Sequence, residues 1–144
     1  MVVRIIPSGD TSIVVEFGDQ IDRLLNGRVL RTNGAVQRAE LKGVTETVPT
    51  FRSLLIHYDP LETSAAELIE QLESMTDAGD EHGFVPRTWC IPACYEDDKA
   101  PDLAKVAERI GLTTDQVIEA HCSRTYHVYM LGFLPGYPYM GDLP

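Results

Sequence analysis

The strand pattern of the chain is clearest in residues 44–60, which read VTETVPTFRSLLIHYDP. Val44–Val48 alternates apolar and polar residues, as a half-buried strand does, and Pro49 ends it. Ser53–His57 predicts the next strand. Tyr58–Pro60 stops that strand, because proline has no N–H for a ladder and restrains the residue before it. The stretch therefore predicts two consecutive strands of a sheet.

The residues before this stretch predict the first half of the same domain. Val2–Ile6 and Ser12–Phe17 are rich in β-branched residues and lie close enough in sequence to pair as a hairpin. Asp19 or Asp22 can cap a following helix, whose apolar residues keep near-helical spacing. Asn33-Gly34 weakens the middle of that helix, and we expect one helix there all the same.

A second helix completes the repeat of elements. Ser64 and Glu67 form the pattern of a capping box ahead of an apolar stripe. The predicted order is ββαββα, four strands with two helices on one face, which is an α+β sandwich over residues 1–76. Residues 77–86 have no periodicity and are the expected linker.

The remaining residues, 87–144, predict fewer strands. We expect a strand at Arg87–Ile91, a helix from Pro101 to a stop at Gly111, a helix capped by Thr113 and a strand at Thr125–Leu131. So short a segment makes a poor core of its own. We therefore expect a partner to complete it, or the chain to be the front part of a longer protein.

Composition narrows the class of protein. Of 144 residues, 44% are hydrophobic and 24% charged, a mixture typical of a globular chain. Lys and Arg number 12 against 22 Asp and Glu, so the net charge of -10 argues against nucleic acid and membrane as partners. No apolar run reaches the about 18 residues of a membrane helix. Three cysteines are too few for a disulfide scaffold, which favours a reduced, cytoplasmic protein.

Several common catalytic motifs are absent from the sequence. There is no phosphate-binding GxxxxGK[ST] or GxGxxG, no GxSxG and no HExxH. Cys90, Cys94 and His121-Cys122 have residue types that bind zinc, but the C-x3-C spacing is loose and Pro92 lies between the two cysteines. We therefore predict no metal and interpret the cysteines as ordinary half-buried residues.

The strongest local signal is the segment 132–142, which reads GFLPGYPYMGD. Glycine lets backbone N–H groups approach a ligand, proline stiffens a loop and aromatic rings supply flat contact area. We expect a rigid aromatic loop here rather than a regular element. It either binds a ligand or closes the end of a barrel.

His121 has two readings from its position. It follows Val117 and Ile118 at helical spacing, so it shares their inward face. The favoured interpretation is a core histidine that holds the helix end to the next strand. The alternative is a proton-transfer group at the mouth of a pocket under the aromatic loop.

Several motifs occur in an order typical of one family. The chain resembles the family of the B subunit of bacterial 5-oxoprolinase, which also includes the KipI kinase inhibitor and allophanate hydrolase subunit 1. It is similar as well to part of the carboxyltransferase domain of urea carboxylase. The motifs are Gly9-Asp10, Val15–Gly18, Val48–Leu54, Tyr58–Pro60, Ile91-Pro92 with Tyr95, Pro101–Leu103, Val117–His121 and, most specific, YHVYMLGFLPGYPY at residues 126–139.

The resemblance implies a fold and a site. The α+β domain is followed by the first part of a cyclophilin-like β-barrel, over residues 87–144, which is cut short relative to the family. Positions that match the family motif are the site candidates. His121 is the catalytic candidate, and the substrate-binding candidates are Tyr126, Tyr129, Gly132, Phe133, Pro135, Gly136 and Tyr137.

The resemblance also implies a function with partners. The chain would serve an ATP-dependent amide-hydrolysing complex with subunits A and C, cleaving 5-oxoproline to L-glutamate, or acting on allophanate. ATP is then a co-substrate whose contacts are unconventional or lie largely on a partner, since no phosphate loop is visible. The alternative is a KipI-like inhibitor, which binds a sensor histidine kinase and blocks its autophosphorylation.

Overall fold

The computed structural model describes residues 3–76, 87–96 and 98–141. These residues fall into two compact units that are not two continuous halves of the chain. Residues up to 76 group with 129–139 in the first unit, and residues 87–128 group with 140 and 141 in the second. The expected linker, residues 77–86, lies outside the described residues, so the boundary there stays a prediction.

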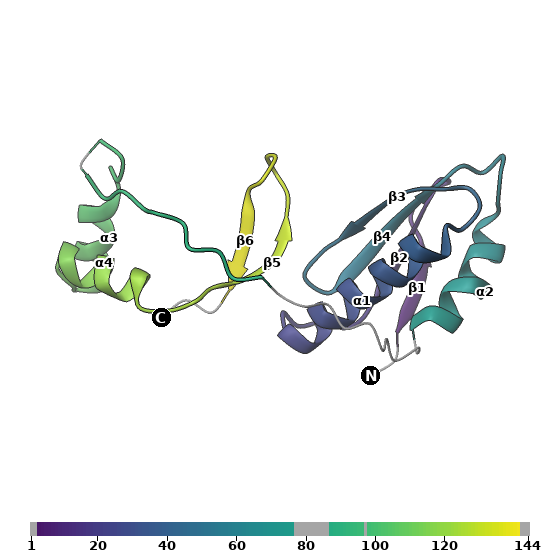
Figure 1. The fold of residues 1–144 in the computed structure, drawn as a ribbon, viewed down its shortest axis with the longest axis horizontal. Helices are drawn as coiled ribbons and strands as arrows, with labels where there is room; N and C mark the ends of the chain where they lie inside the picture. Colours follow the sequence, from purple (N-terminus) through teal and green to yellow (C-terminus); the bar gives the residue numbers. More distant parts are fainter. Residues whose placement is uncertain (1–2, 77–86, 97, 142–144) are drawn as a thin grey trace. The chain divides into compact units, whose positions relative to one another are not determined.

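The first unit is an antiparallel sheet with two helices on one face (Figure 1). The predicted order ββαββα is confirmed. Its strands lie in the order β1-β2-β4-β3, each antiparallel to its neighbour. The elements are β1 (Arg4–Pro7), β2 (Ser12–Glu16), α1 (Arg23–Ala39), β3 (Val44–Pro49), β4 (Ser53–Tyr58) and α2 (Ala65–Thr76).

The core of this unit follows from alternation along the two central strands. In β4 every second side chain is buried, while the intervening ones are partly exposed, and β2 alternates in the same way from Ile13 onward, with Ser12 buried as well. Apolar residues at helical spacing from α1 and α2 fill the other side. The fully or nearly buried set is Ile13, Val15, Phe17, Val29, Val36, Leu54, Ile56, Tyr58, Leu68 and Leu72.

Helix α1 is continuous, as predicted. Its N-cap is Asp22, whose Oδ1 accepts hydrogen bonds from the amides of Leu24 at 2.8 Å and Leu25 at 3.0 Å. Asn33-Gly34 lies inside the helix, close before the buried Val36. Packing of this apolar face against the sheet therefore outweighs the low helix propensity of glycine.

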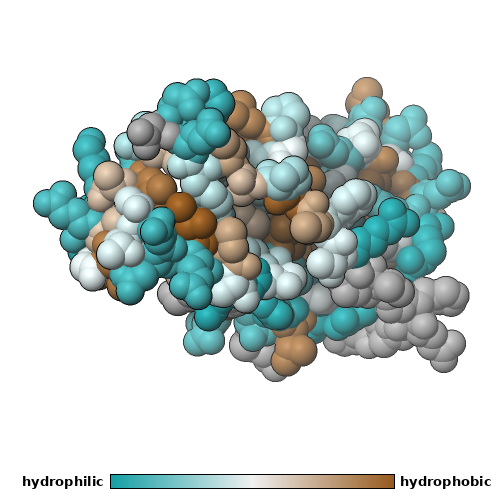
Figure 2. Space-filling view, turned by 60° about the vertical axis from the view of Figure 1, so that its left-hand side comes forward, coloured by the Kyte–Doolittle hydropathy of each residue, from teal (hydrophilic) through white to brown (hydrophobic). Residues whose placement is uncertain are grey.

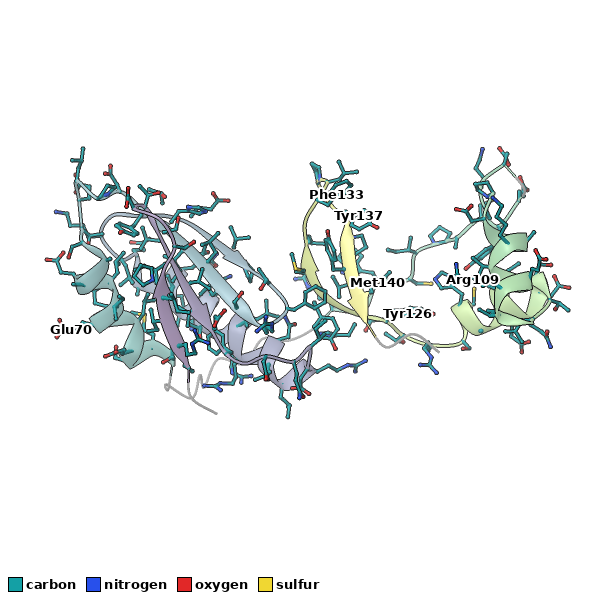
Figure 3. All side chains as sticks on the ribbon, turned by 180° about the vertical axis from the view of Figure 1, so that it is seen from behind. Glu70, Arg109, Tyr126, Phe133, Tyr137 and Met140 are labelled. Carbon is teal, nitrogen blue, oxygen red and sulfur yellow. The ribbon has the colours of Figure 1, made fainter. Side chains whose placement is uncertain are left out.

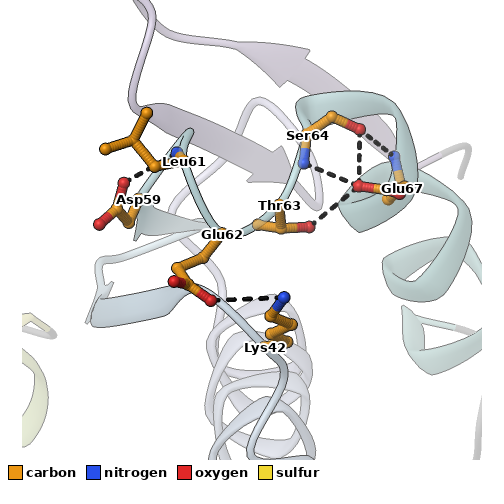
Figure 4. A network of polar contacts seen from close by, with 7 residues as sticks. All are labelled: Lys42, Asp59, Leu61, Glu62, Thr63, Ser64 and Glu67. Carbon is orange, nitrogen blue, oxygen red and sulfur yellow. Dashed lines mark hydrogen bonds and ion pairs between the residues drawn. The ribbon is translucent and has the colours of Figure 1, made fainter.

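The predicted capping box of α2 is present (Figure 4). Glu67 Oε2 accepts from the amide and the hydroxyl of Ser64, both at 2.9 Å, and Ser64 Oγ accepts from the amide of Glu67 at 3.3 Å. These hydrogen bonds, first the one from the Ser64 amide, lower the pKa of Glu67. The start of α2 is thus fixed by residues three apart in sequence.

The second unit contains two helices, α3 (Leu103–Ile110) and α4 (Thr114–Cys122). The predicted cap of α4 by Thr113 is confirmed, and it takes the form of a capping box: Thr113 Oγ1 accepts from the Gln116 amide at 3.2 Å, and Gln116 Oε1 accepts from the Thr113 amide at 2.9 Å. Gly111 ends α3 with a φ of 71°, as predicted. The described residues of this unit bury little. Figure 2 shows brown, hydrophobic side chains at the surface. The exposed large apolar residues of this unit include Trp89, Ile91, Val106, Ile110 and Leu112.

The predicted strand at Arg87–Ile91 is wrong. Residues 87–96 form no strand, and the side chains of Trp89 and Ile91 are 75% and 80% exposed. A β-rich run needs a neighbouring strand to receive its hydrogen bonds, and no described residue supplies one. Local pattern alone therefore misled the prediction here.

The aromatic segment is a hairpin rather than a loop throughout. Strand β5 (His127–Leu131) pairs with β6 (Pro138–Gly141) in a two-stranded sheet. The expected loop is therefore wrong over β6. Pro138 fits because it is the first residue of its strand, where a missing N–H is tolerated. The expected β-barrel stays a prediction, because among the described residues 87–141 the sheet consists of these two strands.

Candidate functional site

The structure brings the predicted site residues into two groups, one in each unit. His121 and Tyr126 lie together in the second unit. Tyr129, Gly132, Phe133, Pro135, Gly136 and Tyr137 lie on the segment that belongs to the first unit.

The histidine cluster consists of Tyr95, His121, Cys122 and Tyr126. His121 occupies the last turn of α4, and its side chain is exposed. The favoured sequence interpretation, a core histidine, is therefore wrong. Its predicted inward neighbours Val117 and Ile118 are themselves only half-buried, because the described residues of this unit pack no apolar layer over that face of α4.

Two tyrosines contact His121, one at its ring and one at its main-chain oxygen. The Tyr95 hydroxyl shares a hydrogen bond with the ring nitrogen Nδ1, and the two rings meet edge-on with centroids 5.9 Å apart. The Tyr126 hydroxyl donates to the main-chain oxygen of His121 at 3.0 Å, and the ring centroids are 5.4 Å apart. His121 is thus exposed yet held by contacts from two directions.

Tyr95 also approaches the thiol of Cys122. Its hydroxyl oxygen lies 3.5 Å from Cys122 Sγ. This hydrogen bond is the main reason that the pKa of Tyr95 is raised, to about 12, and burial and the charges of Cys122 and Tyr126 act in the same direction. At neutral pH, Tyr95 is therefore a protonated phenol that can donate a hydrogen bond.

The aromatic hairpin, residues 129–139, is closed by its own backbone. The Gly132 amide donates to the Tyr137 oxygen at 3.1 Å, and the Tyr137 amide donates to the Leu134 oxygen at 3.0 Å. Gly136 has a φ of 76°, which a side chain would disfavour. The Gly132 N–H, which could have contacted a ligand, therefore donates its hydrogen bond within the hairpin.

The base of the hairpin is anchored to the first unit. The Asn26 amide nitrogen, on a fully buried side chain, donates to the Tyr129 oxygen at 3.0 Å and to the Thr50 oxygen at 3.1 Å. Tyr129 is 4% exposed and its ring packs on Phe51, with centroids 5.3 Å apart, and the Tyr139 ring meets Phe51 edge-on at 6.0 Å. Tyr129 thus holds the hairpin in place.

The tip of the hairpin presents aromatic rings to solvent (Figure 3). Phe133 is 85% exposed, and its ring centroid is 6.0 Å from that of Tyr137, which is 49% exposed. Phe133 has a φ of 58°, a left-handed conformation that a bulky residue adopts with strain. Apart from its contact with Tyr137, this strained and exposed ring adds little to the packing of the described fold, and its binding role stays a prediction.

Replacement of Phe133 by asparagine tests that interpretation. Asparagine tolerates the left-handed region, so Phe133→Asn is expected to leave the free energy of unfolding within about 1 kcal/mol of wild type, or to raise it. The matched control Phe51→Asn removes the ring that packs on Tyr129 and should cost about 2–3 kcal/mol. Urea denaturation measures both. Equal losses at the two positions would show that Phe133 is structural.

The residues of these groups that were not among the predicted site residues include Asn26, Phe51 and Tyr95. Asn26 is a polar residue inside an apolar helix stripe, between Leu25 and Val29, and that mismatch was the available signal. Phe51 and Tyr95 lie within the family motifs, but nothing local to either residue indicates its partner. Tyr95 and His121 are 26 positions apart, and only the fold joins them.

Two further properties concern ligands and membranes. Within residues 3–76, 87–96 and 98–141, no three or more His, Cys, Asp or Glu side chains gather as metal ligands would. Over the same residues, no helix has the length and apolar character needed to cross a bilayer.

Comparison with known proteins identifies the family. The model of the carboxyltransferase domain, subdomain C and D, matches residues 3–144. The chain belongs to this family. Among curated relatives, the 5-oxoprolinase B subunit of Bacillus subtilis is 31% identical over 94% of the chain, which spans 61% of that relative's length. The family predicted from the sequence motifs is thereby confirmed.

Solved structures agree on the fold. The crystal structure of TTHA0988 in space group P212121 has a TM-score of 0.79 and 30% identity, covering 99% of this chain and 26% of that one. Urea carboxylase of Kluyveromyces lactis has a TM-score of 0.63 and 21% identity, covering 90% of this chain and 14% of that one. The carboxyltransferase-domain chain is thus similar to a segment of larger proteins.

Proposed function

We propose that this carboxyltransferase-domain chain is part of the B subunit of a 5-oxoprolinase complex, which opens the 5-oxoproline lactam to L-glutamate with ATP. The supporting observation is the 31% identity to a 5-oxoprolinase B subunit over 94% of the chain. Subunits A and C of that complex would be the partners. The chain would be inactive alone.

The reaction explains why ATP is needed. A lactam amide is stabilised by resonance, so its carbonyl carbon resists attack by water. Transfer of the γ-phosphoryl group to the carbonyl oxygen turns that oxygen into part of a leaving group. Water then attacks the carbon, the C–N bond opens, and a further water releases phosphate. Overall, 5-oxoproline, ATP and two waters give glutamate, ADP and phosphate.

Residues of the two groups would supply two of the functions that this reaction requires. His121, exposed and held by two tyrosines, would orient the substrate or move a proton at the reacting atoms. The exposed rings of Phe133 and Tyr137 would provide flat contact area. A backbone amide could also donate to the developing oxyanion. The Gly132 amide donates to the Tyr137 oxygen, so the Gly136 amide is the candidate for this role.

A turnover assay tests the proposal. The full-length protein is co-purified with subunits A and C, and glutamate release is followed with 5-oxoproline and ATP, with each protein and ATP omitted in turn. Release that requires all components is the expected result. No release in any combination would overturn the proposal. Turnover of allophanate in its place would assign the sibling reaction, and inhibition of a sensor kinase without turnover would assign the KipI-like role.

A further inference from the structure

The Tyr95 hydroxyl lies between two groups of the histidine cluster that can exchange a proton with it, the His121 ring and the Cys122 thiol. Its hydroxyl oxygen is within hydrogen-bond distance of His121 Nδ1 and 3.5 Å from Cys122 Sγ. A phenol has one proton to give and lone pairs to accept with. It can therefore donate to one of these neighbours and accept from the other.

Acceptor strength decides the direction of these hydrogen bonds. An imidazole nitrogen is a good acceptor, whereas a thiol sulfur is a weak one and a thiol S–H is a weak donor. The favourable arrangement runs from Cys122 S–H to the Tyr95 oxygen, and from the Tyr95 O–H to His121 Nδ1. The raised pKa of Tyr95 means that the phenol keeps its proton throughout the neutral range and has it available to donate.

From this geometry we propose that Tyr95 is a positioning residue for His121. By donating to Nδ1, its hydroxyl fixes the imidazole as the Nε2–H tautomer and leaves Nε2 as the nitrogen that faces a ligand. The tautomer assignment stands on the cluster alone. Its catalytic meaning rests on the proposed function, in which His121 orients substrate or transfers a proton.

Nitrogen NMR of the full-length protein tests the tautomer directly. Two-bond correlations from ring carbon-bound protons to both imidazole nitrogens, recorded at a pH well above the usual histidine pKa of about 6.5, distinguish the tautomers of the neutral ring. We expect one Nε2–H tautomer for His121 in the wild type. In Tyr95→Phe the two nitrogen shifts should move toward the average of an exposed, exchanging histidine.

The chain offers a matched control. Tyr126→Phe removes a hydroxyl that touches the same histidine, but at its main-chain oxygen rather than its ring. It should leave the His121 nitrogen shifts as in the wild type. The assignment is overturned if the wild type shows the Nδ1–H form or an average, or if Tyr95→Phe leaves the nitrogen shifts unchanged.

Kinetics of the assembled complex test whether the positioning matters for turnover. Tyr95→Phe should lower kcat about three- to tenfold, the effect of one hydrogen bond, with KM unchanged. Added to His121→Ala, it should change kcat by less than about twofold, since the residue through which it acts is gone. An equal loss in both backgrounds would overturn the kinetic role. Full activity of His121→Ala would instead count against the catalytic use of His121, while the NMR result still decides the tautomer.

Discussion

The His121→Ala variant is expected to lower ATP- and 5-oxoproline-dependent glutamate release at least tenfold while the protein stays folded. A side chain that transfers or orients a proton at the reacting atoms commonly contributes about 100-fold or more. The fold should tolerate the change, because the imidazole is exposed at the end of α4 and fills no core position. Steady-state turnover of the co-purified complex gives the result.

A second histidine provides the control for this variant. His57 lies in β4, where its Nδ1 shares a 2.8 Å hydrogen bond with the hydroxyl of Ser12, outside both candidate groups. His57→Gln should keep turnover within about twofold per folded complex. Thermal melts and co-purification yields verify assembly of each variant. Wild-type turnover in a well-folded His121→Ala protein would contradict a role of His121 in turnover.

Asn26→Asp is expected to destabilise the protein by about 3–5 kcal/mol at pH 7, as an uncompensated buried charge does. The Asn26 side chain is fully buried, and its amide nitrogen donates to the main-chain oxygens of Thr50 and Tyr129. A carboxylate at this position loses those donors and sets negative charge against carbonyl oxygens. Urea denaturation of the full-length protein measures the loss.

The same variant has a predictable dependence on pH. Burial and the facing oxygens disfavour the charged form, so the pKa of the introduced carboxyl is raised in the folded state. Relative to wild type, the free energy of unfolding should therefore be lowered by the full amount at pH values above that raised pKa. The difference should shrink as pH falls toward the ordinary aspartate pKa of about 3.9, because the protonated carboxyl can donate a hydrogen bond again. The difference between the two proteins, measured at each pH, isolates this effect.

The variant Asn26→Leu distinguishes the effect of a buried charge from the effect of losing the hydrogen bonds that the Asn26 amide donates. It leaves the same carbonyl oxygens unsatisfied without adding charge, so its cost should be about 1–3 kcal/mol and independent of pH. Hydrogen exchange at the Gly132 and Tyr137 amides reports in parallel whether the hairpin loosens. Equal, pH-independent losses for the aspartate and leucine variants would refute the burial argument.

The first unit could be predicted because its signals are local. The capping box of Ser64 and Glu67, the N-cap Asp22 and the alternation in β4 each involve residues a few positions apart. Burial on one face then follows from period alone. Even Asn33-Gly34, an unfavourable pair, did not break α1, since the apolar stripe continues on both sides of it.

The errors arose where a partner distant in sequence decides the structure. Arg87–Ile91 has β-rich residues but no described neighbour, and Pro138–Gly141 has turn-rich residues yet pairs with β5. His121 has helical spacing to apolar residues, but the layer that would bury it is missing from the described unit. In each case the local residue pattern favoured one structure, and the presence or absence of a strand partner or a packing layer decided for another.

The candidate site shows the same division. Phe133, Gly136 and Tyr137 were identified from composition, because glycine, proline and aromatic residues rarely concentrate without a reason. The sequence did not indicate which aromatic residues are buried and which are exposed. Tyr129 is buried and anchors the hairpin, while Phe133 faces solvent. The contact of Tyr95 with His121 depends on tertiary structure, and no spacing rule would have proposed it.

Residues 129–139 belong to the same compact unit as the residues up to 76, so residues 87–128 are inserted in the sequence between two parts of that unit. A gene fragment that stops at residue 76 would expose one face of Phe51 and strip the Asn26 amide of an acceptor. Dissection of this family into autonomous modules should therefore keep the late hairpin with the early sheet, by grafting or permutation, instead of cutting the polypeptide once.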